Sequence, residues 1–286
     1  MSAGPGGGPS LAAQHARQRI PGEVAALLVR GAKPAGTVIV DAHAHLGGWH
    51  NFHMPRSDAE GVLRTMDETG IDVASIAPML AIGPDYQAGN ELMAEAVRRY
   101  PDRFRGYVVV NPHYPSGMEP ALRRYCEAPG VVGIKLHPGI HGYPISGPAY
   151  RPVWAFVDDR RLPVLIHTWG TSGHSAPGAV GGVAAEFPNA TFLLGHSGGT
   201  WEGHLQAIEV AKERPNVYLE TCISRSPFGA IEWMVREVGA ERVVFGTDQP
   251  FIDPRPQLGR IAFAKIADAE RRLILGGNAA RLLGIG

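Results

Sequence analysis

Short apolar runs alternate with longer segments of helical period from residue 37 to the end of the chain. Eight of the runs are rich in β-branched residues and bounded by turn-forming residues, as buried strands are. They cover residues 37–43, 72–79, 105–112, 131–138, 163–169, 191–198, 216–222 and 242–250. Because they are almost continuously apolar, they predict a sheet that is covered on both faces.

Between these runs, apolar residues recur every three to four positions, which predicts helices. Clear examples are 58–70, 90–101, 150–161 and 201–215. Strands that alternate with helices indicate parallel connections. Eight such pairs favour one closed (β/α)₈ barrel, the TIM barrel, as a catalytic domain over residues 37–286. An open, doubly wound sheet is the alternative.

The first 36 residues stand outside this pattern. Residues 1–9 are so rich in glycine and proline that we expect them to be disordered. Residues 10–30 have a helical pattern that breaks near Pro21. The predicted fold is therefore an α/β barrel with a short helical extension at its N-terminus.

The composition is that of an ordinary globular protein, with 44% hydrophobic and 19% charged residues in 286. The 27 basic and 27 acidic residues balance, and no basic block suggests nucleic-acid binding. No apolar run reaches the roughly 18 residues of a membrane span. Without a secretion signal we expect a cytoplasmic protein. Its two cysteines, Cys126 and Cys222, are too few for a disulfide framework.

Polar residues recur where the predicted strands end, and the active site of a (β/α)₈ barrel lies at that carboxyl end. A purely structural core would be apolar there, so the pattern predicts one shared site. The residues are His43, His45, Asn111, His113, Lys135, His137, His167, His196, Glu220, Thr221 and Asp248.

His43 and His45 begin this series. Residues two apart on a strand point to the same face, about 7 Å apart at a rise of about 3.3 Å per residue. Two such imidazoles can share a cation about 2.1 Å from each nitrogen. The alternative is two solvated histidines at the end of a strand. Asp41 lies on the same face and is expected to form hydrogen bonds inside the barrel.

Four more residues have both a functional and an ordinary interpretation. His167 and His196 end apolar strands, where single histidines are commonly hydrogen-bonded core residues. Asp248 would be a costly buried carboxylate without a cation, unless it caps a helix. Lys135 needs an anion inside the barrel, unless it faces the outer helices. One site at the mouth of the barrel accounts for all four.

The order of these residues resembles the amidohydrolase superfamily. The segments "DAHAHLG", "GIKLHP", "LIHTWG", "LLGHSGG", "VFGTDQPF" and "ILGGNAARLLGI" are more narrowly similar to the amidohydrolase-related (amidohydrolase 2) family. That family includes decarboxylases of aminocarboxymuconate semialdehyde and resorcylate, lactonases and other hydrolases. The resemblance covers residues 37–286.

The resemblance implies one divalent metal ion, usually zinc, held by His43, His45, His167 and Asp248. It places His196 beside the metal as the residue that polarises the substrate or transfers a proton. Three imidazoles and one carboxylate suit Zn²⁺. Zinc lowers the pKa of a bound water from 15.7 to about 7, and Asp248 would take its proton.

Lys135 leaves the metal count open. In two-metal members of the superfamily a carboxylated lysine bridges the ions, and this chain has the residues for that arrangement. We favour one metal, with Lys135 as an unmodified cation that binds an acidic group of the substrate. We also expect that only one of Lys135 and His137 faces the interior.

Substrate contacts are assigned to Lys135, His137, Arg225 and Trp49, the last two in loops after predicted strands. Arg56 is an alternative to Arg225 as a clamp for a substrate carboxylate. Solvent-exposed loop arginines are the ordinary interpretation of both.

These observations predict a metal-dependent hydrolase of a small ester, lactone or amide. A metal-dependent decarboxylase of an aromatic or unsaturated carboxylic acid is the first alternative, and a non-catalytic metal-binding barrel is the second. The expected partner is a small molecule that can carry a carboxylate, and the sequence is compatible with a homodimer.

Overall fold

Eight parallel strands stand at the centre of the molecule. The computed structural model describes residues 22–51 and 53–285 of the chain. Within them the strands follow one another around the sheet in chain order, each paired with the next. They are β1 (Val40–Leu46), β2 (Val73–Pro78), β3 (Phe104–Val109), β4 (Val131–Leu136), β5 (Pro163–His167), β6 (Thr191–Gly195), β7 (Val217–Glu220) and β8 (Val243–Val244).

The chain after β7 returns to β1 and closes the sheet. The amide of Ala42 donates to the carbonyl of Phe245 at 3.0 Å, and the amide of Asp248 donates to the carbonyl of His43 at 2.7 Å. The closed (β/α)₈ barrel is therefore confirmed, and the open sheet is rejected.

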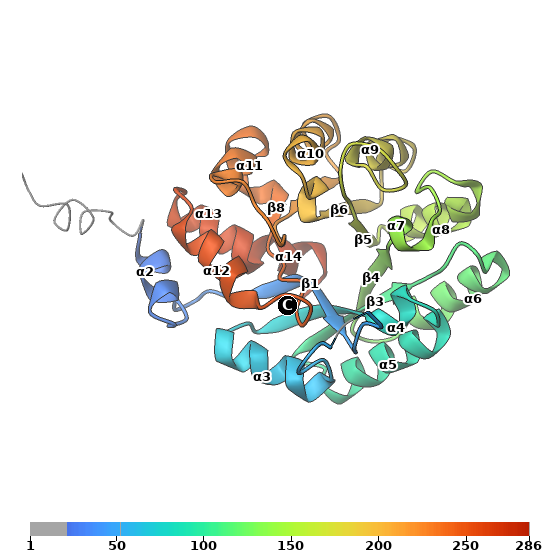
Figure 1. Cartoon of the computed structure of the whole chain (residues 1–286), viewed down its shortest axis with the longest axis horizontal. Coiled ribbons are helices and arrows are strands. Elements are labelled where there is room, and N and C mark those ends of the chain that lie inside the picture. The colour runs from blue at the N-terminus through green and yellow to red at the C-terminus, as the bar shows by residue number, and fades with distance from the viewer. Residues whose placement is uncertain (1–21, 52, 286) are drawn as a thin grey trace, which may run out of the picture.

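Helices form a ring around the strands (Figure 1). They are α3 (Ala59–Thr69), α4 (Met79–Ile82), α5 (Tyr86–Arg99), α6 (Pro115–Cys126), α7 (Pro138–His141), α8 (Arg151–Arg160), α9 (Pro177–Glu186), α10 (Trp201–Glu213), α11 (Ala230–Val238), α12 (Pro254–Phe263), α13 (Asp268–Arg272) and α14 (Asn278–Leu282). None of the helices within residues 22–51 and 53–285 is long and apolar enough to cross a membrane.

Helix α3 illustrates how local sequence sets these elements. The side chain of Asp58 accepts a hydrogen bond from the amide of Gly61 at 2.6 Å and caps the start of the helix. Gly70 ends the helix in the left-handed conformation, with φ 74°. The buried side chains of Val62 and Met66 face the barrel.

The N-terminal extension contains the helix α2 (Glu23–Val29). Its first turn is anchored to α13, because the carboxylate of Asp268 accepts a hydrogen bond from the amide of Glu23 at 2.7 Å. The helical extension is thus confirmed for the residues that the structure describes. The expectations for residues 1–9 and for a break at Pro21 lie outside them.

The strands end at other residues than the sequence predicts, and three of these differences bear on the site. Strand β1 runs on to Leu46, so His43 and His45 both lie within it. Strand β6 ends at Gly195 and β8 at Val244, well short of the predicted ends. The backbones of His196 and Asp248 have φ 65° and 63°, in a left-handed region that does not continue a strand.

A continuous apolar core fills the space between strands and helices. Both cysteines are free thiols, as expected; Cys222 is buried, whereas Cys126 is half-buried. Buried polar side chains gather at the end of the barrel where the strands finish.

Candidate metal centre and active site

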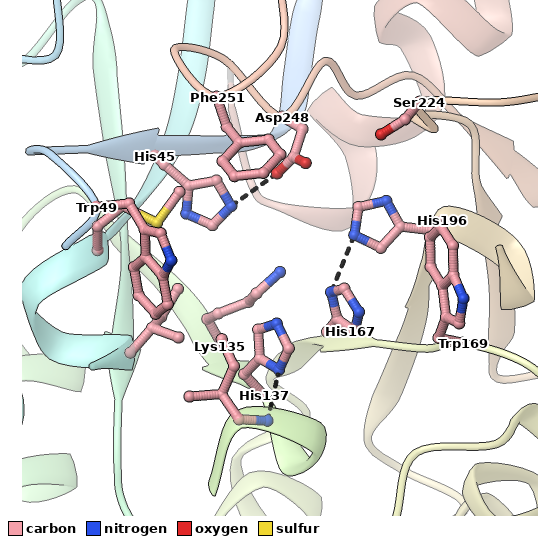
Figure 2. Close-up of a pocket in the computed structure, with 13 residues that line it drawn as sticks. His45, Trp49, Lys135, His137, His167, Trp169, His196, Ser224, Asp248 and Phe251 are labelled. Carbon is pink, nitrogen blue, oxygen red and sulfur yellow. Dashed lines mark hydrogen bonds and ion pairs between the residues drawn. The ribbon is translucent and has the colours of Figure 1, made fainter. Parts of the chain in front are cut away.

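A cavity of about 480 Å³ opens at the carboxyl ends of the strands. Its base is polar and buried, and its rim is apolar and half-exposed, with Ile140, Trp169 and Phe251 between 41% and 44% exposed. Figure 2 shows the polar side chains converging on the centre. The lining residues are His45, Trp49, Met79, Ile82, Lys135, His137, Ile140, His167, Trp169, His196, Ser224, Asp248 and Phe251.

His45 presents an unprotonated nitrogen to the base of the cavity. Its Nδ1 lies 2.9 Å from the carbonyl oxygen of Ala77, which only accepts, so Nδ1 carries the proton. In the neutral ring Nε2 is then a lone pair, and it lies 2.9 Å from Oδ1 of Asp248. Two electron-rich atoms at this distance repel each other unless a cation or a proton lies between them.

His43 presents its Nε2 in the same way. Its Nδ1–H donates to Oε2 of Glu220 at 2.9 Å, and Nε2 lies 3.5 Å from Oδ1 of Asp248. The ligand atoms of His43, His45 and Asp248 all lie within 4.8 Å of one another. Metal-binding histidines typically donate their other N–H to a carboxylate or a carbonyl, as both rings do here. The donor set therefore fits a divalent metal ion.

Charge and burial shape this cluster. Burial, followed by the nearby Lys135 cation, holds the pKa of His43 well below its usual value. The Nζ of Lys135 lies 2.6 Å from Nε2 of His43. Burial lowers the pKa of Lys135 to about 8. Burial by itself would raise the pKa of Asp248, but the contact with His45 and the nearby His43 lower it.

Asp41 fixes the loop that carries Asp248. It is fully buried and accepts hydrogen bonds from the amides of His43 and Thr247, both at 3.0 Å, and from Nε2 of Gln249 at 2.9 Å. Burial raises the pKa of Asp41 to about 7. The expected hydrogen bonds of Asp41 inside the barrel are confirmed.

Glu220 is a supporting residue to which sequence reasoning assigned no role. It is fully buried and accepts from Nδ1 of His43 at 2.9 Å and from the amide of His196 at 3.0 Å. The Sγ of Cys222 lies 3.2 Å from the same carboxylate. The available signal was an acidic residue at the end of the apolar run "NVYLE".

His167 and His196 meet on the other side of the cavity. Nδ1 of His196 donates to the carbonyl of Cys222 at 3.0 Å. Its Nε2 lies 3.0 Å from Nδ1 of His167, so one proton is held between the two rings. Burial lowers the pKa of His196 to about 4. His167 lies outside the group formed by His43, His45 and Asp248, and its part as a metal ligand stays a prediction.

The residues assigned to substrate binding are placed unequally. Lys135, His137 and Trp49 line the cavity. The expectation that only one of Lys135 and His137 faces inward is wrong, because residues two apart on an extended chain point to the same side. Arg225 is exposed and lies outside the lining residues, so its role stays a prediction. Arg56 pairs with Glu68 at 2.8 Å.

Several lining residues were not predicted from the sequence. Met79 and Ile82 come from the short helix α4, Ile140 from α7, and Trp169, Ser224 and Phe251 from loops after strands. The ring of His137 stacks on that of His167, with centroids 3.8 Å apart and 16° between the planes. Trp169 lies nearly parallel to His167, at 6.1 Å.

Comparisons with known proteins agree with this architecture. A family model described as amidohydrolase matches residues 40–285. A gamma-resorcylate decarboxylase from Rhodococcus jostii is 25% identical over 297 residues, covering 82% of this chain and 90% of the relative.

Solved structures show the same fold. A 5-carboxyvanillate decarboxylase from Sphingomonas paucimobilis has a TM-score of 0.70 at 17% identity, covering 88% of this chain and all of that one. A dihydroxybenzoic acid decarboxylase from Polaromonas was solved with bound manganese and 2-nitroresorcinol. It has a TM-score of 0.63 at 18% identity, covering 87% of this chain and 97% of that one.

These findings overturn the prediction of ester, lactone or amide hydrolysis. The three similar proteins described above are all decarboxylases by name. The same histidines and aspartate at the mouth of a barrel support both reactions, so the residue pattern alone could not separate them.

Proposed function

The chain belongs to the amidohydrolase family, and we propose on that premise that it is a metal-dependent decarboxylase of an aromatic or unsaturated carboxylic acid. The proposal rests chiefly on one arrangement. A metal-ligand group, the ammonium of Lys135 and a proton held between two histidines face the same cavity. The decarboxylases among the relatives support the reaction class.

His43, His45 and Asp248 would hold one divalent ion, with His167 as the further ligand that the sequence assigns. Zinc suits three imidazoles and a carboxylate, and manganese is the alternative because a related decarboxylase structure contains it. When bound, the ion would neutralise and orient the carboxylate of the substrate. A second ion on a carboxylated Lys135 remains the competing arrangement.

Side chains of this protein bind and orient the substrate. Lys135 is mainly protonated at neutral pH and supplies a positive charge at the base of the cavity for the carboxylate. Trp49 and Phe251 offer apolar surface to a flat substrate, and the stacked pair His137 and His167 offers another (Figure 2). The substrate is thus oriented with its carboxylate toward the base.

Proton delivery completes the reaction. The bond from the carboxylate to its neighbouring carbon breaks, and the electron pair stays on that carbon. The carbon takes a proton that solvent supplies through Nε2 of His196, and carbon dioxide leaves. Solvent restores the proton to the histidine pair.

A product assay tests the proposal. Protein loaded with zinc or manganese is incubated with 2,6-dihydroxybenzoate and a panel of hydroxybenzoates and unsaturated carboxylic acids in ¹⁸O-labelled water. We expect release of carbon dioxide and no ¹⁸O in the organic product. Protein stripped of metal by a chelator should be inactive and recover when the ion is restored.

Two results would reject the proposal. Incorporation of ¹⁸O without carbon dioxide would return the assignment to hydrolysis. Binding of the ion without turnover of any acid in the panel would favour the non-catalytic barrel.

A further inference from the structure

The turn that carries His196 has a backbone conformation that side chains normally avoid. His196 has φ 65° and Ser197 has φ 45°, two consecutive left-handed residues other than glycine. Such residues persist only where the surrounding structure holds them. The direction of the His196 ring therefore depends on the contacts that fix this turn.

Thr168 ties both sides of the turn with one hydroxyl. Its Oγ1 donates to the carbonyl of Gly195 at 2.7 Å and accepts from the amide of Gly198 at 2.9 Å. These two residues flank His196 and Ser197. The Thr168 side chain is fully buried and does not line the cavity, so it has no route to the substrate.

Other contacts anchor the same turn to different elements. Ser197 Oγ donates to the carbonyl of Glu220 at 2.8 Å, toward β7. The carbonyl of Ser197 accepts from Nδ1 of His204 at 2.7 Å, on α10. The Thr168 hydroxyl is different because it comes from the residue directly after His167, at the end of β5.

Backbone hydrogen bonds reinforce this connection between the two loops. The amide of Thr168 donates to the carbonyl of Gly195 at 3.1 Å, and the amide of Gly170 donates to that of Gly198 at 2.8 Å. The 3.0 Å contact between His167 and His196 is therefore set by a bridge in which Thr168 supplies the side-chain part.

We propose that Thr168 is a positioning residue, whose hydroxyl holds the turn of His196 so that the His196 ring keeps its 3.0 Å contact with His167 at the cavity. The inference rests on the proposed function, because His196 is the residue that passes a proton to carbon in that proposal. Although Thr168 follows His167 in the chain, its hydroxyl contacts only the backbone of Gly195 and Gly198.

The test compares two variants with the unchanged protein. Thr168→Val keeps the shape but removes both hydroxyl hydrogen bonds, whereas Thr168→Ser keeps the hydroxyl. With 2,6-dihydroxybenzoate as the probe, we expect Thr168→Val to lower kcat by about 10- to 100-fold, since small misplacements of a catalytic group have effects of this size. KM and metal content should stay within about twofold, and Thr168→Ser should restore most of kcat and the wild-type pH profile.

A second measurement does not depend on turnover. Imidazole ¹⁵N chemical shifts of zinc-loaded protein, assigned with a His196→Gln variant, report whether Nε2 of His196 and Nδ1 of His167 share a proton. We expect Thr168→Val to change both shifts and Thr168→Ser to preserve them. If the unchanged protein decarboxylates nothing, the proposed function fails, but these shifts still decide the role of Thr168.

The inference is overturned if Thr168→Val keeps the wild-type kcat, pH profile and imidazole shifts. It is also overturned if the valine and serine variants lose metal and activity equally, since the residue would then be merely structural. Should Thr168→Val fail to fold, Thr168→Ala takes its place in the same comparison. Wild-type shifts in that variant would equally reject the inference.

Discussion

The two sides of the cavity are built differently. The ligand wall consists of His43 and His45 on β1 with Asp248 after β8, all buried. The substrate wall consists of His137, after β4, and Trp169, after β5, both partly exposed. Their rings lie on either side of His167 on β5, the further assigned ligand, which belongs to neither wall. Each ligand-wall imidazole has its second nitrogen fixed by a hydrogen bond, whereas stacking is prominent in the substrate wall.

This difference separates two tasks. A cation requires fixed donors, because a small displacement of any ligand weakens the whole set. Buried carboxylates supply that rigidity, with Asp41 behind the loop of Asp248 and Glu220 behind His43. Stacked rings at a half-exposed rim can be exchanged without disturbing the metal. We therefore expect substitutions in the ligand wall to affect metal binding and those in the substrate wall to affect substrate choice.

The largest effect is expected for Asp248→Asn. The variant keeps the shape of the side chain but loses the negative charge between two imidazole lone pairs. Metal affinity should fall by more than about 100-fold, because even changes behind a ligand cost about 10–100-fold, and activity should vanish with the metal. Metal analysis after dialysis measures this. Asp253 is an exposed carboxylate on the same loop, and the Asp253→Asn variant should retain a full equivalent of metal. Equal loss of metal in both variants would contradict the role of Asp248 as a ligand.

His196 lies between the two walls, and its loss should separate metal binding from catalysis. His196→Ala should lower kcat by about 10²–10⁴-fold, the usual contribution of a proton-transferring group. Metal content should be unchanged, because the two ring nitrogens of His196 contact the carbonyl of Cys222 and the ring of His167. His174→Ala, an exposed histidine outside the cavity, is the matched control. Loss of metal on His196→Ala would move that residue into the ligand wall.

Glu220→Gln tests the support behind the ligand wall. The glutamine side chain would face the Nδ1–H of His43 in one of two ways. Its NH2 group cannot accept that hydrogen bond, and its oxygen is a weaker acceptor than a carboxylate. Metal affinity should fall by about 10–100-fold while the ion still binds at high concentration. Competition with a chelator measures the dissociation constant, and Glu241→Gln provides an exposed control. An unchanged constant would mean that His43 does not need this partner.

The smallest effect on the metal centre is expected from Trp169→Leu in the substrate wall. An aromatic contact contributes about 0.5–1.5 kcal/mol, which corresponds to about two- to tenfold in KM. Metal affinity should not change. Trp201→Leu, on α10 and stacked on Trp233, is the control at a distant surface. A loss of metal on Trp169→Leu would abolish the distinction between the two walls.

Much of this site could be predicted from the sequence, because its residues end apolar strands. The barrel, the pair His43 and His45, and their convergence with Asp248 all follow from strand order and from the rule that parallel strands end together. Those features depend on local patterns that repeat in register along the chain.

Other features depend on contacts that no local pattern encodes. The hydrogen bond from His43 to Glu220 joins residues 177 positions apart, and only the closed barrel brings them together. The apolar run predicted a strand over residues 191–198, but the left-handed turn at His196 ends β6 at Gly195. The choice of hydrolysis over decarboxylation was wrong because the same residue types at the barrel mouth support both reactions.

The cavity also contains built-in optical probes. Of the chain's five tryptophans, Trp49 and Trp169 line the cavity, whereas Trp154 is buried in the core and Trp201 stacks on Trp233 at a separate surface. A flat aromatic acid that enters would displace water from the two cavity indoles and lie within quenching distance of them. The emission of the other three would stay constant. Intrinsic fluorescence of the unlabelled protein should therefore follow the arrival and departure of a ligand in real time.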